Sequence, residues 1–222
     1  MTRATRPGSA AAERRKPAAR DPAASRARIL RAATAEFAHA GFAGGRVDRI
    51  AARARLNKRM IYHYFGSKSG LYLAVREATY GDIRAAERTL DLEHLEPVAA
   101  VTRLVQFTWD YYLRHPEFLR LINTENLHRA THLRRSRRIA EMHSPFVELI
   151  AQLLRRGEAA GLFRAGLDPR QVYISIAALG YFYLNNRFTL SVIYGTDLSA
   201  PAALQQRRAV IVETVLAYLR AG

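Results

Sequence analysis

Residues 47–65, VDRIAARARLNKRMIYHYF, decide the fold of this 222-residue chain. Apolar side chains recur at helical spacing between Val47 and Ala54 and predict a short helix. A tight turn at residues 55–57 leads into a second short helix, predicted for residues 58–64. Two short helices joined by such a turn, inside a basic segment, are typical of helix-turn-helix DNA binding.

The second of these helices has one apolar and one polar face. Ile61 and Phe65 are four residues apart, so we expect them to face the core, with Tyr64 beside them. The opposite face carries basic, aromatic and hydrogen-bonding groups, which suit contact with phosphates and base edges. A solvated basic helix on an unrelated bundle is the alternative, and the local concentration of charge favours DNA binding. The side chains expected to face outward are Lys58, Arg59, Met60, Tyr62 and His63.

Positive charge is concentrated in the first third of the chain. The net charge is +16, and residues 1–70, with 16 basic and 4 acidic side chains, hold +12 of it. A surface adapted only for solubility would spread this charge evenly, so the asymmetry favours a basic module that binds nucleic acid. The chain contains no cysteine, which excludes disulfide scaffolds, thiolate metal sites and cysteine nucleophiles and fits a reducing compartment.

We expect residues 1–24 to form a flexible basic tail, because they lack the large apolar side chains with which a segment packs. They also lack the apolar stretch of a secretory signal. The most apolar window, residues 172–190, is interrupted by polar and charged groups and cannot span a membrane. The prediction is a cytoplasmic protein without a membrane partner.

The rest of the chain has helical periodicity, and no stretch shows the period-two alternation of a strand with hairpin turns. We therefore expect an all-α fold with two parts. Residues 25–70 would form a three-helix DNA-binding head, and a long fourth helix beginning at about residue 68 would join it to a helical body, residues 71–222. The expected helix starts and ends include Ser25, Gly41, Gly66, Ser67, Pro97, Ser144-Pro145, Gly161, Asp168-Pro169, Tyr194-Gly195, Pro201 and Arg220.

The head carries four runs of residues in a characteristic order: AATAEF at 32–37, VDRIA at 47–51, ARLNK at 54–58 and IYHYFGSK at 61–68. In this order they resemble the tetracycline-repressor (TetR) family of bacterial transcription regulators. The resemblance is specific over residues 25–80, because the last of these runs is rarely met elsewhere. Over residues 81–222 the resemblance is architectural only, in that the body is helical and about the right length.

The resemblance implies an all-α homodimer whose heads bind a palindromic operator in double-stranded DNA. It implies that the first three residues of the second short helix lie nearest the bases, with Tyr62 and His63 on phosphates. Lys68, at the start of the fourth helix, would bind another phosphate, where the helix dipole and the ammonium reinforce each other. The DNA-binding set predicted in this way is Arg46, Asn57, Lys58, Arg59, Met60, Tyr62, His63 and Lys68.

Two positions depart from the family pattern. Family members usually have glycine at the position of Arg55, where the turn needs a left-handed backbone. They usually begin the second helix with a threonine that caps it and contacts phosphate, and here that position holds Arg46. Arg46 can still bind phosphate through its charge, but the cap must come from elsewhere.

Aromatic and polar side chains are frequent in residues 107–132 and 173–194. They could line an effector pocket that is mostly apolar with a few polar groups, or form an ordinary core with a polar rim. The resemblance, which implies an unidentified small-molecule effector, favours the pocket. Its predicted lining is Phe107, Trp109, Tyr111, Tyr112, Asn123, Asn126, His128, Tyr173 and Tyr181.

Two further clusters have simpler interpretations. Glu125, His128 and His132 could share one helical face and hold a metal ion, but no further ligand is evident, so we predict no metal and no other cofactor. The basic run at residues 134–138 is interpreted as a solvated face, with an anionic ligand or flanking DNA as the alternative.

The last two helices, about 170–193 and 201–220, carry more apolar surface than one small body needs. We predict that they form a four-helix homodimer interface with a second copy. The apolar residues that suggest it are Ile174, Ala177, Ala178, Tyr181, Val210, Ile211, Val215 and Leu216.

The function predicted from the sequence is a homodimeric transcriptional repressor released from its operator by a small molecule. Phosphate-binding glycine loops, nucleophile elbows and zinc-protease motifs are missing from the sequence, so we do not expect an enzyme. The alternative is a non-regulatory helical protein that associates with a membrane surface or with nucleic acid.

Overall fold

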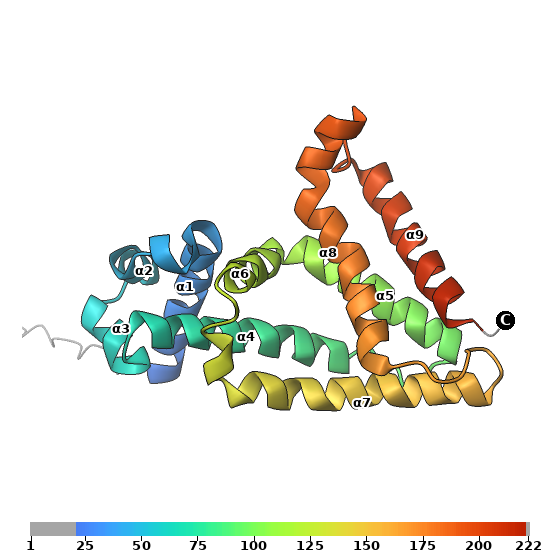
Figure 1. Ribbon diagram of the computed structural model, residues 1–222. Coiled ribbons are helices and arrows are strands. Elements are labelled where there is room, and N and C mark those ends of the chain that lie inside the picture. The colour runs from blue at the N-terminus through green and yellow to red at the C-terminus, as the bar shows by residue number, and fades with distance from the viewer. Residues whose placement is uncertain (1–20, 221–222) are drawn as a thin grey trace, which may run out of the picture.

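The computed structural model describes residues 21–220, and every regular element in this range is helical, which confirms the expected all-α fold (Figure 1). An isolated bridge between Phe163 and Arg220 is the only β-type pairing among these residues. The α-helices are α1 (Pro22–Gly44), α2 (Val47–Ala54), α3 (Lys58–Phe65), α4 (Lys68–Arg88), α5 (Pro97–Arg114), α6 (Pro116–Leu127), α7 (Arg137–Ala159), α8 (Pro169–Tyr194) and α9 (Pro201–Leu219), with a short 3₁₀ turn, η1 (Leu133–Arg135), between α6 and α7.

The head consists of α1, α2, α3 and the first half of α4, packed around one apolar core (Figure 1). Ile29 of α1, Ile50 of α2 and Ile61 of α3 are fully buried there. Tyr72 of α4 is also fully buried, and its ring packs edge-on against Phe37 of α1 at 5.1 Å. The head is therefore fastened to α4, which continues into the body.

The body is built from α4 to α9. α4 lies alongside α7, and α5 packs against both α8 and α9 (Figure 1). Its core includes Leu104 and Trp109 of α5, Ile150 of α7 and Ile176 of α8. Between residues 21 and 220, no helix combines the length and the apolar character needed to cross a membrane.

Several helix boundaries lie where local signals predicted them. The Ser67 hydroxyl accepts a hydrogen bond from the Gly70 N–H at 3.0 Å and caps α4. Asp168 caps α8 by accepting from the Arg170 N–H at 2.8 Å. Gly195, with φ of 62°, ends α8, and Gly41, with φ of 67°, interrupts the helical backbone near the end of α1.

The predicted start of α7 at Ser144-Pro145 is wrong. Ser136 caps this helix, and Pro145 lies inside it. Proline removes one main-chain donor from the helix interior, yet the helix continues because the next residue is anchored in the body. Phe146 is buried, with the Arg84 guanidinium 4.1 Å above its ring and the Tyr173 ring 5.0 Å away.

The predicted tail is shorter than expected. α1 begins at Pro22 rather than Ser25, because the Asp21 carboxylate accepts from the Ala23 N–H at 2.8 Å and proline follows the cap. Residues 21–24 therefore belong to the head. Residues 1–20 of the predicted tail lie outside the described residues.

Candidate nucleic-acid interface and effector cavities

The turn between α2 and α3 is left-handed at one residue. Arg55 has φ of 52° and ψ of 45°, as its position in the turn predicted, and its N–H donates to the Ala52 carbonyl at 3.0 Å. Asn57 then caps α3, its Oδ1 accepting from the Arg59 N–H at 2.8 Å. Asn57 was predicted to contact DNA, and in the structure its carboxamide oxygen fixes the start of α3.

α3 is held to the head by its apolar face. Ile61 is fully buried, and Tyr64 and Phe65 are half-buried, so the predicted division of the helix is confirmed for these three side chains. The Arg26 guanidinium covers the Phe65 ring at 5.2 Å. The other face is open: Lys58, Arg59, Tyr62 and His63 are exposed, and Met60 is half-buried.

Lys58 links the starts of α2 and α3. Its Nζ lies 2.8 Å from Asp48 Oδ1, and both side chains are exposed. The hydrogen bond to Asp48 raises the pKa of Lys58 above its usual value, so the ammonium keeps its charge. Because an exposed ion pair of this kind is weak, Lys58 can exchange its carboxylate partner for a phosphate or a base.

The buried carboxylate of Glu36 organises the start of α2. Its Oε1 accepts from the Arg46 N–H at 3.0 Å and lies 3.0 Å from Nε of Arg49. No side chain caps α2 at Arg46, and Glu36 of α1 instead holds the N–H of Arg46 itself, just before the helix begins. The Arg46 side chain remains exposed.

Lys68 lies at the first residue of α4 and reaches back to α1. Its Nζ donates to the Ala43 carbonyl at 3.1 Å and lies 5.0 Å from the centre of the Phe42 ring. The ammonium has two further N–H groups, and Lys68 belongs to the first turn of α4, where the helix dipole favours an anion. This end of α4 can therefore hold an anion.

Sequence reasoning missed one basic feature of the head. Arg28 and Arg31 of α1, together with Arg53 and Arg55 at the end of α2, line a hollow of about 370 Å³. The spacing of Arg28 and Arg31, one turn apart on a predicted helix, indicated that the two side chains share a face. The hollow extends the positive surface of the head beyond α3.

The aromatic residues of the predicted effector set lie mostly on α5, at its contact with α8. Trp109 and Tyr112 pack on Gly180 of α8, where an added Cβ would lie 3.6 Å from each ring. Burial raises the pKa of Tyr112 well above its usual value. The Tyr173 hydroxyl accepts a hydrogen bond from Arg84 Nη2 at 2.7 Å. Of the remaining aromatic members, Tyr111 is buried and Phe107 is half-buried, with ring centres 5.7 Å apart.

The polar half of the predicted set lies at α6. Asn123 hydrogen-bonds to Asn185 and to the Tyr181 hydroxyl, which ties α6 to α8. Asn126 and His128 are exposed at the end of α6. Asn123 and Tyr181 are thus brought together, whereas Asn126 and His128 lie on the surface.

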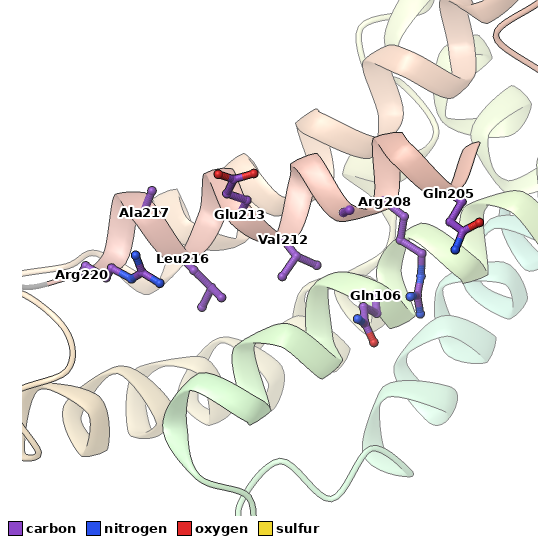
Figure 2. Close-up of a pocket in the computed structure, with 9 residues that line it drawn as sticks. Gln106, Gln205, Arg208, Val212, Glu213, Leu216, Ala217 and Arg220 are labelled. Atoms are coloured by element: carbon purple, nitrogen blue, oxygen red, sulfur yellow. The ribbon is translucent and has the colours of Figure 1, made fainter. Parts of the chain in front are cut away.

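Within residues 21–220, two of the hollows that border the body are large enough for a small molecule. One, of about 540 Å³, lies between α5 and α9, and Figure 2 shows Val212 and Leu216 pointing from α9 toward α5. Its edge carries an ion pair in which Arg208 Nη2 lies 3.1 Å from Asp110 Oδ2. The other, of about 440 Å³, lies between the head and the body. Tyr111 is the one residue of the predicted effector set that lines either of these two hollows.

Glu125 and His132 do not form a metal site with His128. The buried Glu125 Oε1 accepts the main-chain N–H groups of His132 at 2.9 Å and Leu133 at 3.0 Å. Within residues 21–220, no group of three or more histidine and acidic side chains is placed to hold a metal ion. The cluster instead supports a stack in which the His132 ring lies 4.4 Å from Phe42 and 4.8 Å from Tyr72.

α8 and α9 leave apolar side chains exposed along one side of the body. Of the residues that suggested a dimer interface, Ile211 and Val215 are buried within the body, whereas Ile174 and Val210 are exposed. The exposed set is larger than predicted toward the end of α8. It comprises Ile174, Phe182, Phe188, Val192, Ile193 and Tyr194 of α8 with Val210 and Tyr218 of α9.

Two family models match the chain in the order in which its two parts occur. Residues 29–75 match the model described as bacterial regulatory proteins, tetR family, and residues 97–215 match the tetracyclin repressor-like C-terminal domain. The chain is 40% identical over 196 residues to the HTH-type transcriptional repressor NicS of Pseudomonas putida, covering 88% of this chain and 92% of that protein.

Solved structures share the whole architecture. SCO4942 from Streptomyces coelicolor superposes with a TM-score of 0.66 at 27% identity, covering 88% of this chain and 98% of that chain. The ketosteroid transcriptional regulator KstR2 of Mycobacterium tuberculosis superposes with a TM-score of 0.65 at 20% identity, covering 89% and 95%, and shows the shared fold alone. The left-handed turn, the open basic face of α3 and these matches agree: the chain belongs to the TetR family of bacterial transcription regulators.

Proposed function

We propose that the protein is a homodimeric repressor that binds a palindromic operator and leaves it when a small molecule binds in the body. The observation that carries the proposal is the open face of α3. Ile61 anchors this helix, while Lys58, Arg59 and Tyr62 project from it without apolar cover. Basic and hydroxyl-bearing groups on a rigid helix suit the donor and acceptor pattern of the major groove.

The proposed contacts divide by chemistry. Lys58, Arg59 and Met60, at the start of α3, would read base edges, because the first turn of a recognition helix enters the groove most deeply. Arg46, Tyr62, His63 and Lys68 would hold phosphates and set the register of the head on the duplex. Asn57 would support this contact through its cap on α3.

The proposed dimer uses the exposed apolar side of α8 and α9. Phe188 and Val192 are 65% and 83% exposed, and side chains of this size rarely cluster on the free surface of a monomer. An isologous contact between two copies would cover both sets at once. It would also place two heads on successive major grooves, whose centres lie about 34–36 Å apart.

The test begins with selection of duplexes from a random library by the purified protein. A palindromic consensus, protected as two half-sites one helical turn apart and bound by two chains, is the expected result. Anionic phosphatidylserine vesicles provide the contrast. Binding to vesicles without a preferred duplex sequence would favour the membrane-surface alternative and overturn the proposal.

Repression is tested separately in cells. A reporter placed behind the selected operator should be silent when the protein is expressed and active when it is absent. An increase in reporter expression on adding the protein would make it an activator, which contradicts the repressor part of the proposal and leaves the DNA-binding part standing.

A further inference from the structure

Arg76, in the middle of α4, is fully buried at 0% exposure. Among residues 21–220, none of its side-chain nitrogens has a hydrogen-bond partner, and none forms an ion pair. Its guanidinium carbon lies 5.1 Å from the centre of the Tyr80 ring. Burying an ionised guanidinium without an acceptor is strongly unfavourable, so the position calls for an anion.

A second arginine lies on the same side of α4, two turns further on. Arg84 is 3% exposed, and it has partners: Nε lies 2.9 Å from Glu87 Oε2, and Nη2 donates to the Tyr173 hydroxyl. Burial raises the pKa of Glu87 to about 8, against the attraction of Arg84 and Arg88. Even when ionised, Glu87 balances one guanidinium, so the buried pair of arginines keeps a positive excess.

Two acidic groups near this part of α4, Glu77 and Glu125, already accept hydrogen bonds. Glu125 Oε1 accepts hydrogen bonds from two main-chain N–H groups, and Glu77 Oε1 accepts one from the Ser136 hydroxyl at 2.7 Å. His143 of α7 faces Tyr80 at 5.4 Å, and burial, with Arg84 nearby, lowers its pKa, which favours the neutral ring. Among residues 21–220, no carboxylate forms a hydrogen bond with Arg76, although the buried Glu125 Oε2 also has no hydrogen-bond partner.

The surroundings of Arg76 are aromatic. Tyr72, Arg76 and Tyr80 are spaced four residues apart and share one face of α4. The Phe118 ring of α6 packs edge-on against Tyr80 at 5.6 Å, and the buried Tyr72 hydroxyl has no hydrogen-bond partner among residues 21–220. A guanidinium fork among rings suits a planar carboxylate attached to an aromatic group.

We propose that Arg76 anchors a site for a small aromatic monocarboxylate, flanked by Tyr72, Tyr80 and Phe118. The further statement that this ligand is the effector rests on the proposed function. α4 provides the connection, because the helix that carries Arg76 also carries Tyr72, which packs in the head, and Lys68 at its start. A ligand held by Arg76 would thus act on the helix that positions α3.

Binding is measured first without DNA, by thermal shift and calorimetry on the full chain. The probes are benzoate and phenylacetate, their neutral amides, and inorganic phosphate. We expect both carboxylates to raise the Tm in a concentration-dependent way, and the amides and phosphate to leave it unchanged. Equal stabilisation by an amide and its acid, or none by either carboxylate, would overturn the proposal.

Three variants locate the site. Arg76→Met should weaken carboxylate binding at least tenfold and, by removing an unpaired buried charge, raise the Tm of the ligand-free protein by roughly 2–4 °C. Arg76→Lys keeps the charge without the planar fork, so its affinity for the carboxylates should lie between that of the wild-type chain and that of Arg76→Met. Arg103→Met removes an exposed arginine of α5 and should change neither quantity. A lower Tm in ligand-free Arg76→Met would assign Arg76 a structural role and overturn the proposal.

The effector role is read from operator binding with the same probes. A carboxylate that binds the wild-type chain but leaves operator affinity unchanged would overturn the effector role and leave the site standing. A chain that binds the carboxylate but selects no operator would overturn the proposed function and not the site. Loss of operator affinity with the carboxylates, absent in Arg76→Met, is the expected result.

Discussion

α3 and α8 each leave one face uncovered, and the two faces differ in chemistry. α3 buries Ile61 and exposes basic and polar groups, so its face is suited to a polyanion. α8 buries a stripe from Val172 to Leu184 and exposes large apolar side chains, so its face is suited to another apolar surface. The chemistry of an uncovered helix face therefore indicates which class of partner can bind there, and the area of that face does not.

The difference is sharpest in the last third of α8. Leu184 is the last of its buried residues, and the ten residues that follow include four large apolar side chains more than half exposed. In Figure 1 this end of α8 rises away from α4 and α7, beside the start of α9. Within residues 21–220, these four side chains remain largely uncovered.

The largest expected effect comes from replacing apolar side chains on the exposed face of α8 with charged ones. Phe188→Glu combined with Val192→Glu should place like charges at the proposed interface and yield a monomer by light scattering. Operator affinity, measured by fluorescence anisotropy, should fall about 10²–10⁴-fold, because the two heads would no longer be linked. Gln171→Glu, at the exposed start of α8, is the control and should stay dimeric. A double variant that remains a dimer would place the interface elsewhere.

The next effect concerns the corner between α3 and α4. A Cβ at Gly70 would lie 2.1 Å from the Phe65 carbonyl oxygen, so Gly70→Ala should displace the end of α3 and cost about 1–3 kcal/mol of stability. Gly81→Ala, on the same helix, meets only Met142 Sδ at 3.8 Å and should stabilise by about 0.5–1 kcal/mol. Urea denaturation measures both. Equal effects of the two substitutions would mean that the corner can relax.

Lys68 tests whether the basic face of the head extends to α4. Lys68→Ala should weaken binding to all duplexes alike and reduce the salt slope of the binding constant by about one unit for each phosphate that the variant no longer neutralises. Titrations at several salt concentrations with the selected operator and a scrambled duplex measure this. A changed base preference with an unchanged slope would show that Lys68 does not bind phosphate.

The smallest effect is at the turn that aims α3. Arg55 has a left-handed backbone, which costs an L-residue roughly 1–2 kcal/mol, so Arg55→Gly should be neutral to stabilising by up to about 1 kcal/mol. Arg53→Gly removes the same charge from within α2 and should destabilise by about 1 kcal/mol. Both should weaken DNA binding slightly. Destabilisation by Arg55→Gly would show that the side chain holds the turn.

The head could be predicted from the sequence in detail because its signals are local. The turn at Arg55, the cap at Ser67 and the burial of Ile61 each depend on residues within a few positions of one another. The role of Glu36 could not be predicted in this way, because its carboxylate meets Arg46 ten residues later in the chain. The local sequence pattern predicts where the helices begin and end, whereas contacts between helices decide which side chains meet.

The body was predicted less well for the same reason. Ser144-Pro145 was predicted to be a helix start, but α7 continues through it, and the next residue, Phe146, packs against Arg84 and Tyr173. The burial of Arg76 was not predicted from the sequence. Its position four residues after Tyr72, between the buried Val75 and Thr79, was the signal for its burial.

Leu121 has a consequence for how the molecule unfolds. It belongs to α6, yet it lies fully buried in the core of the head, and Phe42 of α1 stacks on His132 just beyond α6. Opening the head would uncover Leu121, and unravelling α6 would remove part of the core of the head. Amide protons of α1 and α6 should therefore exchange through one shared opening, and the protein should melt in a single cooperative transition.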